Sequence, residues 1–130
     1  MKISEVSKQL DISEDTLRYY EKIDLVSPKR NSSHIRDYSE EDFLRLDFIK
    51  CMRQAGLSIE FLSLYLKMYA QGDSTLTERK NLLIQQREIL LNKMNDMKKT
   101  LERLNFKIDN YDRLLSGKIS NSHECEKKGK

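Results

Sequence analysis

Residues 15–22, DTLRYYEK, carry one arginine and two tyrosines in consecutive positions, Arg18, Tyr19 and Tyr20. Guanidinium and phenol groups donate hydrogen bonds to phosphate oxygens, and an arginine near the start of a recognition helix can also reach guanine edges in a major groove. On a helix, Arg18 can point outward while Tyr20 turns its ring toward a core. The segment therefore predicts a DNA-facing surface, although two tyrosines on a helix are equally typical of an amphipathic core.

Two short helices joined by a tight turn would position this segment. Ile3, Val6 and Leu10 have the spacing of a first helix, and Ser13 would cap a second one. Tyr20 would face the core from that second helix. Two such helices form a helix-turn-helix, in which the second helix enters a DNA groove.

A small β-hairpin is expected next, in residues 25–39, LVSPKRNSSHIRDYS. The segment Asn31-Ser32-Ser33 has the composition of its turn. Its basic rim would lie on flanking phosphates and consists of Lys29, Arg30, His34 and Arg36. Ser39 then begins a third helix that runs to about Ala55, and Ser58 begins a fourth.

The stretch between Gly72 and Gly117 contains no Pro or Gly and carries a seven-residue apolar repeat. The repeat consists of Leu76, Leu83, Leu90, Met97, Leu104 and Tyr111, with Met94, Leu101, Ile108 and Leu115 between them. This is the seam of a coiled coil, and Thr75 with Glu78 predicts a capping box at its start. At 1.5 Å per residue the helix would be roughly 60 Å long. Because no second long helix is available to cover the seam, we expect a homodimer.

The composition indicates a thin core and a heavily charged surface, with 38% apolar and 35% charged residues. The net charge of +3 permits a nucleic-acid partner without demanding one. Residues 1–38 hold seven Lys or Arg and seven Asp or Glu, so a positive face there must come from placement. No apolar signal segment is seen at MKISEVSKQL, and no run approaches the roughly 20 apolar residues of a membrane span. We expect a cytoplasmic protein with no membrane contact and no structural disulfide.

The segments ISEVSKQLDISEDTLRYYEKIDLV and IRDYSEEDFLRLDFIKCMRQAGLSIE resemble the MerR family of transcriptional regulators. The similarity covers roughly residues 2–70 position by position and residues 74–116 by architecture. It implies a mostly α fold, with a winged helix-turn-helix carrying a small β wing, followed by a long C-terminal helix that forms an antiparallel coiled-coil dimer. We expect a DNA-binding domain in residues 1–72, a dimerisation helix in 73–116 and a flexible polar tail in 117–130.

The resemblance also implies a dimer that bends and untwists double-stranded promoter DNA with an over-long spacer, so that RNA polymerase can use it. By position it assigns DNA contacts to Thr16, Arg18, Tyr19, Tyr20, Arg36, Tyr38 and Arg53, beside Lys29 and Arg30 of the predicted rim. Two positions depart from the family. His34 stands where the family usually has Gly, and Ile35 stands where it has Tyr, so the turn of the wing and its aromatic contact are expected to differ.

Cys51, in FIKCMRQAGLS, is the candidate sensing residue. Helical spacing puts it on one face with Leu44, Phe48 and Ala55, which is also what a small buried hydrophobe would show. The segment is similar to the NmlR/AdhR-like branch of the family, which responds to aldehydes and related electrophiles through a lone cysteine. We therefore expect a thiol switch at Cys51.

We expect neither a metal site, nor a cofactor, nor an enzyme. His123 and Cys125 are too few ligands for a soft metal. No nucleophile–base pair, phosphate loop or carboxylate pair stands out. Two alternatives stay open. In the first, the protein is a similar regulator that responds to another small ligand, and Cys51 is inert. In the second, it is a coiled-coil adaptor whose N-terminal domain binds protein.

Overall fold

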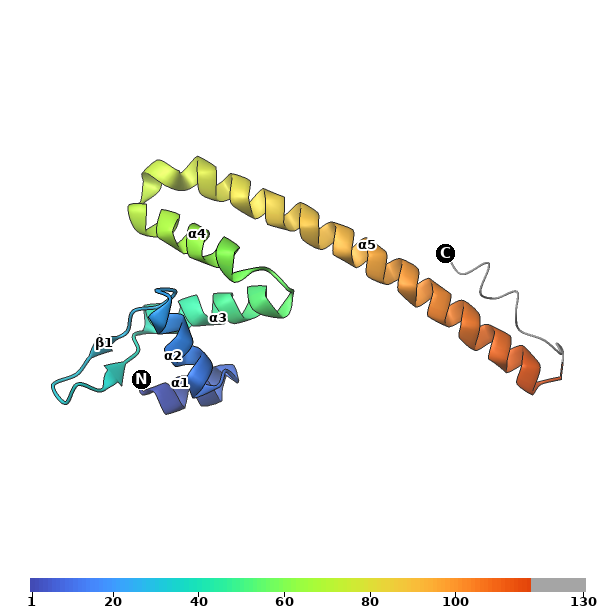
Figure 1. The fold of residues 1–130 in the computed structure, drawn as a ribbon, viewed down its shortest axis with the longest axis horizontal. Coiled ribbons are helices and arrows are strands. Elements are labelled where there is room, and N and C mark those ends of the chain that lie inside the picture. The colour runs from blue at the N-terminus through green and yellow to red at the C-terminus, as the bar shows by residue number, and fades with distance from the viewer. Residues whose placement is uncertain (118–130) are drawn as a thin grey trace. The chain divides into compact units, whose positions relative to one another are not determined.

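The computed structural model describes residues 1–117 and confirms the predicted mostly helical architecture (Figure 1). The elements in chain order are α1 (Ile3–Leu10), α2 (Glu14–Lys22), β1 (Lys29–Arg30), β2 (Arg36–Asp37), α3 (Glu40–Gln54), α4 (Ile59–Gln71), the 3₁₀ turn η1 (Asp73–Thr75) and α5 (Leu76–Leu115). The tail predicted for residues 117–130 lies outside the described residues except for Gly117. In the described part, no helix combines the length and the apolar character that a membrane crossing needs.

A core shared by the first four helices holds the N-terminal compact unit together. Its fully buried members include Val6 of α1, Leu17 of α2, Leu46 and Ile49 of α3, and Leu62 of α4. Burying one such side chain contributes about 1.5–3 kcal/mol. Helices of eight or nine residues are marginal on their own, so α1 and α2 depend on this shared core.

Serine side chains begin three of these helices, as the sequence predicts. The Oγ atoms of Ser13, Ser39 and Ser58 accept hydrogen bonds of 3.0–3.1 Å from the backbone amides three residues ahead. At Ser39 the box is complete, because the Asp42 carboxylate accepts in turn from the Ser39 amide at 2.9 Å. Each helix start is thus fixed by residues within one turn.

The wing is a two-stranded antiparallel hairpin in which Lys29 pairs with Asp37 and Arg30 with Arg36. The Asn31 Oδ1 atom accepts from two amides of the turn, those of Ser33 and Ile35. His34 has a φ of +62°, in the left-handed region that glycine adopts without cost. The histidine therefore takes the backbone conformation that the family's usual glycine favours.

Thr75 does not form the predicted capping box with Glu78. Its hydroxyl lies 2.7 Å from the Met68 carbonyl and 2.9 Å from the Gly72 carbonyl, and it accepts from Arg79 Nε at 2.9 Å. The side chain is buried, so it ties the end of α4 to the start of α5. Leu82 also packs on the core, and the N-terminal compact unit extends to Ile84.

The apolar seam of α5 is exposed along the described chain. Met94, Met97, Leu101 and Leu104 are each more than half exposed, as are Ile108 and Tyr111. A column of large apolar side chains left in water is costly, and large exposed apolar patches are typical of interaction surfaces. The continuous helix from Leu76 to Leu115 carries this column, as the repeat predicts.

Replacing Ser39 with alanine tests the capping box of α3. We expect Ser39→Ala to lower the free energy of unfolding by about 1 kcal/mol, because the Asp42 amide loses its acceptor. Urea unfolding at one fixed protein concentration measures the loss. Ser27→Ala is the control, since Ser27 is exposed and lies outside the helices. An unchanged midpoint for Ser39→Ala would contradict the role of this cap.

Candidate nucleic-acid interface

The outward face of α2 carries Arg18 and Tyr19. Leu17 and Tyr20 are 0% and 7% exposed, whereas Tyr19 is 50% exposed and the Arg18 side chain 46%. Arg18 donates to Asp15 Oδ1 at 2.9 Å and to Glu14 Oε1 at 3.1 Å. The helix therefore divides as the sequence predicts, with one aromatic ring inside and the arginine outside.

The wing arginines meet the other end of the same helix through Glu21. Arg36 Nε donates to Glu21 Oε1 at 2.5 Å, and Arg30 lies 3.5 Å from Glu21 Oε2. The hydrogen bond to Glu21 raises the pKa of Arg36 further above its ordinary value, so this guanidinium is permanently charged. Arg30 also donates to the His34 carbonyl at 3.2 Å, which fixes it across the hairpin turn.

Helical spacing places Glu14, Arg18 and Glu21 on one stripe of α2. The wing arginines lie at the C-terminal end of that stripe, because both contact Glu21. Arg18 and the carboxylate that pairs with Arg30 and Arg36 therefore share one stripe of α2. Sequence reasoning found the arginines and missed Glu21, although its place one turn after Arg18 was a signal.

A second group of polar residues borders the start of α2. A groove of about 370 Å³ brings Thr16 and Tyr20 together with Lys50 and Arg53 of α3. Lys50 Nζ donates to the Leu10 carbonyl, and Arg53 donates to the Leu57 carbonyl at 2.8 Å. Thr16 and Arg53 were predicted contacts. Lys50, three residues before Arg53 on the same helix, was not singled out for DNA.

The structure places Tyr38 in the core. Its side chain is 2% exposed, and its buried hydroxyl has no hydrogen-bond partner in the described part of the chain. Burial raises the pKa of this phenol above its ordinary value, so it is neutral. We therefore assign Tyr38 and the ring of Tyr20 to the core and leave both out of the candidate contacts.

Lys29 stays exposed on β1.

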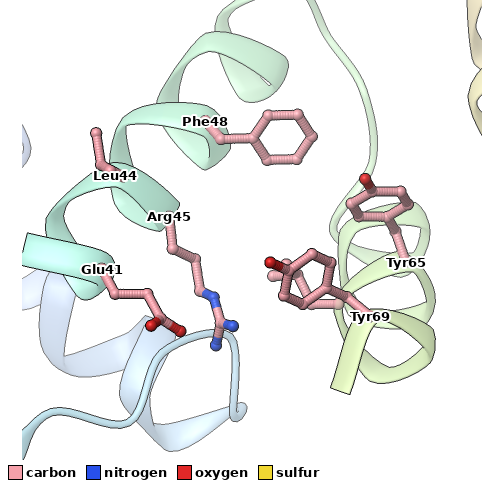
Figure 2. A pocket seen from close by; sticks show the side chains of 7 residues that line it. Glu41, Leu44, Arg45, Phe48, Tyr65 and Tyr69 are labelled. Carbon is pink, nitrogen blue, oxygen red and sulfur yellow. The ribbon is translucent and has the colours of Figure 1, made fainter. Parts of the chain in front are cut away.

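Cys51 lies on the exposed side of α3 in the described chain. It is not the small buried hydrophobe that helical spacing also permitted. One turn before it, Phe48 lines a pocket of about 280 Å³ together with Leu44 and Arg45 of α3 and with Tyr65 and Tyr69 of α4. Figure 2 shows Phe48 reaching from α3 toward Tyr65, and their ring centroids are 5.7 Å apart.

Within residues 1–117, no group of three His, Cys, Asp or Glu side chains is arranged to hold a metal ion. His123 and Cys125 lie outside the described residues, so their exclusion as a metal site stays a prediction. The chemistry that the described surface offers is hydrogen bonding and charge pairing by guanidinium, phenol and ammonium groups. Such groups bind the phosphates and base edges of nucleic acids.

Two family models match the chain. One described as MerR HTH family regulatory protein covers residues 1–69, and one described as MerR, DNA binding covers residues 43–105. The transcriptional regulator AdhR of Bacillus subtilis (strain 168) is 50% identical over 92 residues. That match spans 70% of this chain and 66% of the length of AdhR, just under two thirds.

Solved structures share the fold. A MerR family transcriptional regulator from Listeria monocytogenes has a TM-score of 0.85 and 44% identity, over 90% of this chain and 89% of that one. HiNmlR, a MerR family regulator lacking the sensor domain and bound to promoter DNA, has a TM-score of 0.81 over 89% of each chain. At 23% identity it supports the fold alone. These relatives are regulators rather than enzymes. The helix-turn-helix, the wing and both family matches show that this chain belongs to the MerR family, as a DNA-binding transcriptional regulator close to its NmlR/AdhR-like branch.

Proposed function

We propose that this regulator binds double-stranded promoter DNA through the outward face of α2 and the wing. The observation that carries the proposal is that Arg18 lies on the same stripe of α2 as Glu21, which holds Arg30 and Arg36 of the wing. The second helix of a helix-turn-helix enters the major groove, and a wing reaches the adjacent backbone. HiNmlR, which has the same fold, is bound to promoter DNA.

Two copies act together in this proposal. The exposed seam of α5 pairs with the seam of a second copy, antiparallel as the family resemblance implies. Pairing removes a column of apolar side chains from water and places two DNA-binding heads on one molecule. A symmetric dimer matches two half-sites on a duplex.

The two heads deform the promoter between them. The bound dimer bends and untwists a promoter whose spacer is too long, which brings the recognition elements of RNA polymerase into register. The bending energy is supplied by contacts between protein and DNA backbone, so part of the specificity is indirect. The protein acts in the cytoplasm, where promoter DNA and polymerase are found.

Cys51 is the proposed sensor. Its thiol is exposed on α3, and its neighbour in the sequence, Lys50, lines the groove beside α2. The sulfur adds to the carbonyl carbon of an aldehyde, and the thiol proton moves to the carbonyl oxygen, which gives a hemithioacetal. The added bulk beside Phe48 changes the packing of α3 on its neighbours, and with it the presentation of the DNA-binding head.

The aromatic pocket favours one alternative, in which Cys51 is inert. Phe48, Tyr65 and Tyr69 with Leu44 surround a mostly apolar space of about 280 Å³, which suits a small apolar ligand. Such a ligand would act on the same two helices without covalent chemistry. The two mechanisms differ in whether the response needs the thiol.

Replacing Arg18 tests the DNA-binding surface. The DNA in this test is a duplex that carries the promoter upstream of the protein's own gene. We expect Arg18→Ala to weaken binding by about 5- to 150-fold, because one guanidinium contact is lost. Fluorescence anisotropy at several salt concentrations measures it, and Lys67→Ala on α4 is the control with the same charge change. Tight binding by Arg18→Ala would place the surface elsewhere. If the wild-type protein fails to bind the duplex, the adaptor alternative is favoured.

A lysine in the seam tests the dimer. We expect Leu101→Lys to raise the dimer dissociation constant at least about 100-fold, because each copy buries a charge in place of a leucine. Sedimentation equilibrium gives the constant. Asn95→Lys adds the same charge away from the seam and should remain dimeric. A dimer of unchanged stability in Leu101→Lys would rule out this seam as the interface.

Removing the thiol tests the sensor. We expect Cys51→Ser to bind promoter DNA as the wild type does and to lose the response to formaldehyde or methylglyoxal in a promoter assay. Cys125→Ser, which removes the other cysteine of the chain, should respond normally. Intact mass after aldehyde treatment should show the adduct in Cys125→Ser and not in Cys51→Ser. A normal response by Cys51→Ser refutes the switch and favours the pocket.

A further inference from the structure

Arg18 is held between two carboxylates of its own helix before it meets any DNA. Its Nη1 atom lies 2.9 Å from Asp15 Oδ1 and its Nη2 atom 3.1 Å from Glu14 Oε1. The side chain of Arg18 is 46% exposed, that of Asp15 is 96% exposed and that of Glu14 is 40% exposed. Exposed ion pairs of this kind contribute little to stability, so folding alone does not account for the arrangement.

For the recognition of DNA, the position of these two carboxylates on α2 matters more than the strength of their ion pairs with Arg18. Glu14 and Asp15 occupy the first turn of α2, and recognition helices present their N-terminal residues to base edges. The first turn of a helix also favours acidic residues through its dipole, as Glu60 of α4 and Glu78 of α5 illustrate. Only on α2 do such residues clasp an arginine of the proposed DNA-binding face, among the ion pairs of residues 1–117.

Binding to a duplex of arbitrary sequence gains little when Arg18 must give up its ion pairs with Glu14 and Asp15. When Arg18 turns to a phosphate, it leaves two carboxylates facing a polyanion without partners, and like charges repel. A duplex with a guanine beside a cytosine in the right register is different. Arg18 can then donate to guanine O6 and N7 while a carboxylate accepts from the cytosine amino group.

We infer that Glu14 and Asp15 are specificity-determining residues, which hold Arg18 away from phosphates and penalise DNA that lacks a guanine–cytosine step at this point of the half-site. The inference rests on the proposed binding of DNA by α2. It agrees with the local charge, since residues 1–38 hold equal numbers of basic and acidic side chains. Residues 1–38 therefore have no excess of positive charge that would favour binding to DNA of any sequence.

The experiment compares two duplexes and two pairs of substitutions on the full-length protein. Dissociation constants are measured by anisotropy, at one fixed salt concentration, for the upstream promoter duplex and for a scrambled duplex of the same composition. The test variant is Glu14→Gln with Asp15→Asn. The control is Glu60→Gln with Glu78→Gln, which removes the same charge from the first turns of α4 and α5.

We expect the test variant to bind the scrambled duplex at least about 10-fold more tightly while its promoter affinity stays the same or falls, so that the specificity ratio drops at least about 10-fold. The control should change both affinities alike. Asp15→Asn alone, at a side chain that is 96% exposed, should show part of the drop without affecting folding. A ratio that stays at the wild-type value in the test variant overturns the inference.

The same measurements separate this inference from the proposed function. A wild-type protein that prefers its promoter, together with an unchanged ratio in the variant, refutes the role of the carboxylates and leaves DNA binding intact. A wild-type protein that binds both duplexes equally, or neither, refutes the proposed function and the inference with it.

Discussion

The burial of Leu17 and Tyr20 decides which way the recognition helix faces. A helix of nine residues is marginal alone, so α2 keeps its orientation only through the core it shares with α1, α3 and α4. Once these two side chains point inward, the helical turn forces the intervening Arg18 and Tyr19 outward. The outward position of Arg18 and Tyr19, on the face proposed to bind DNA, is thus a consequence of the apolar packing beneath it.

The arginine side chains of α2 and the wing are paired with side chains of opposite charge and do not form a patch of one sign. Arg30 and Arg36 are paired neighbours across the hairpin, where two guanidinium groups would repel each other without a shared counterion. The Glu21 carboxylate lies against both and joins the wing to the end of α2. The same residue therefore joins the wing to α2 and offsets part of the positive charge of the proposed DNA-binding surface.

The first turns of α5 belong to the N-terminal compact unit, which ends at Ile84, and the rest of the helix exposes the apolar seam. The Thr75 hydroxyl and Arg79 tie the end of α4 to the start of α5, and Leu82 adds an apolar contact with the core. Beyond Ile84 the apolar side chains of the seam have no such cover in the described chain. In the proposed dimer, these contacts at Thr75 would couple each DNA-binding unit to its own long helix.

The sequence by itself determined the features that depend on neighbouring residues. The helix starts at Ser13, Ser39 and Ser58 and the seven-residue seam were predictable, because caps and helical faces are set within one or two turns. The hairpin in residues 25–39 and the order of the elements were also predicted from the residues, and the family resemblance identified the hairpin as a wing. The left-handed conformation of His34 was not predicted, because its replacement of the usual glycine led us to expect a different turn there.

Only the tertiary structure decided which polar groups meet and which side chains the core encloses. Tyr38 was a predicted DNA contact and is buried, Thr75 was a predicted cap and is a link between helices, and Cys51 is exposed. The contact of Glu21 with Arg36 spans fifteen positions. Local spacing carries no information about such pairs, because burial and charge pairing depend on how the elements pack, and packing brings together residues that the chain keeps apart.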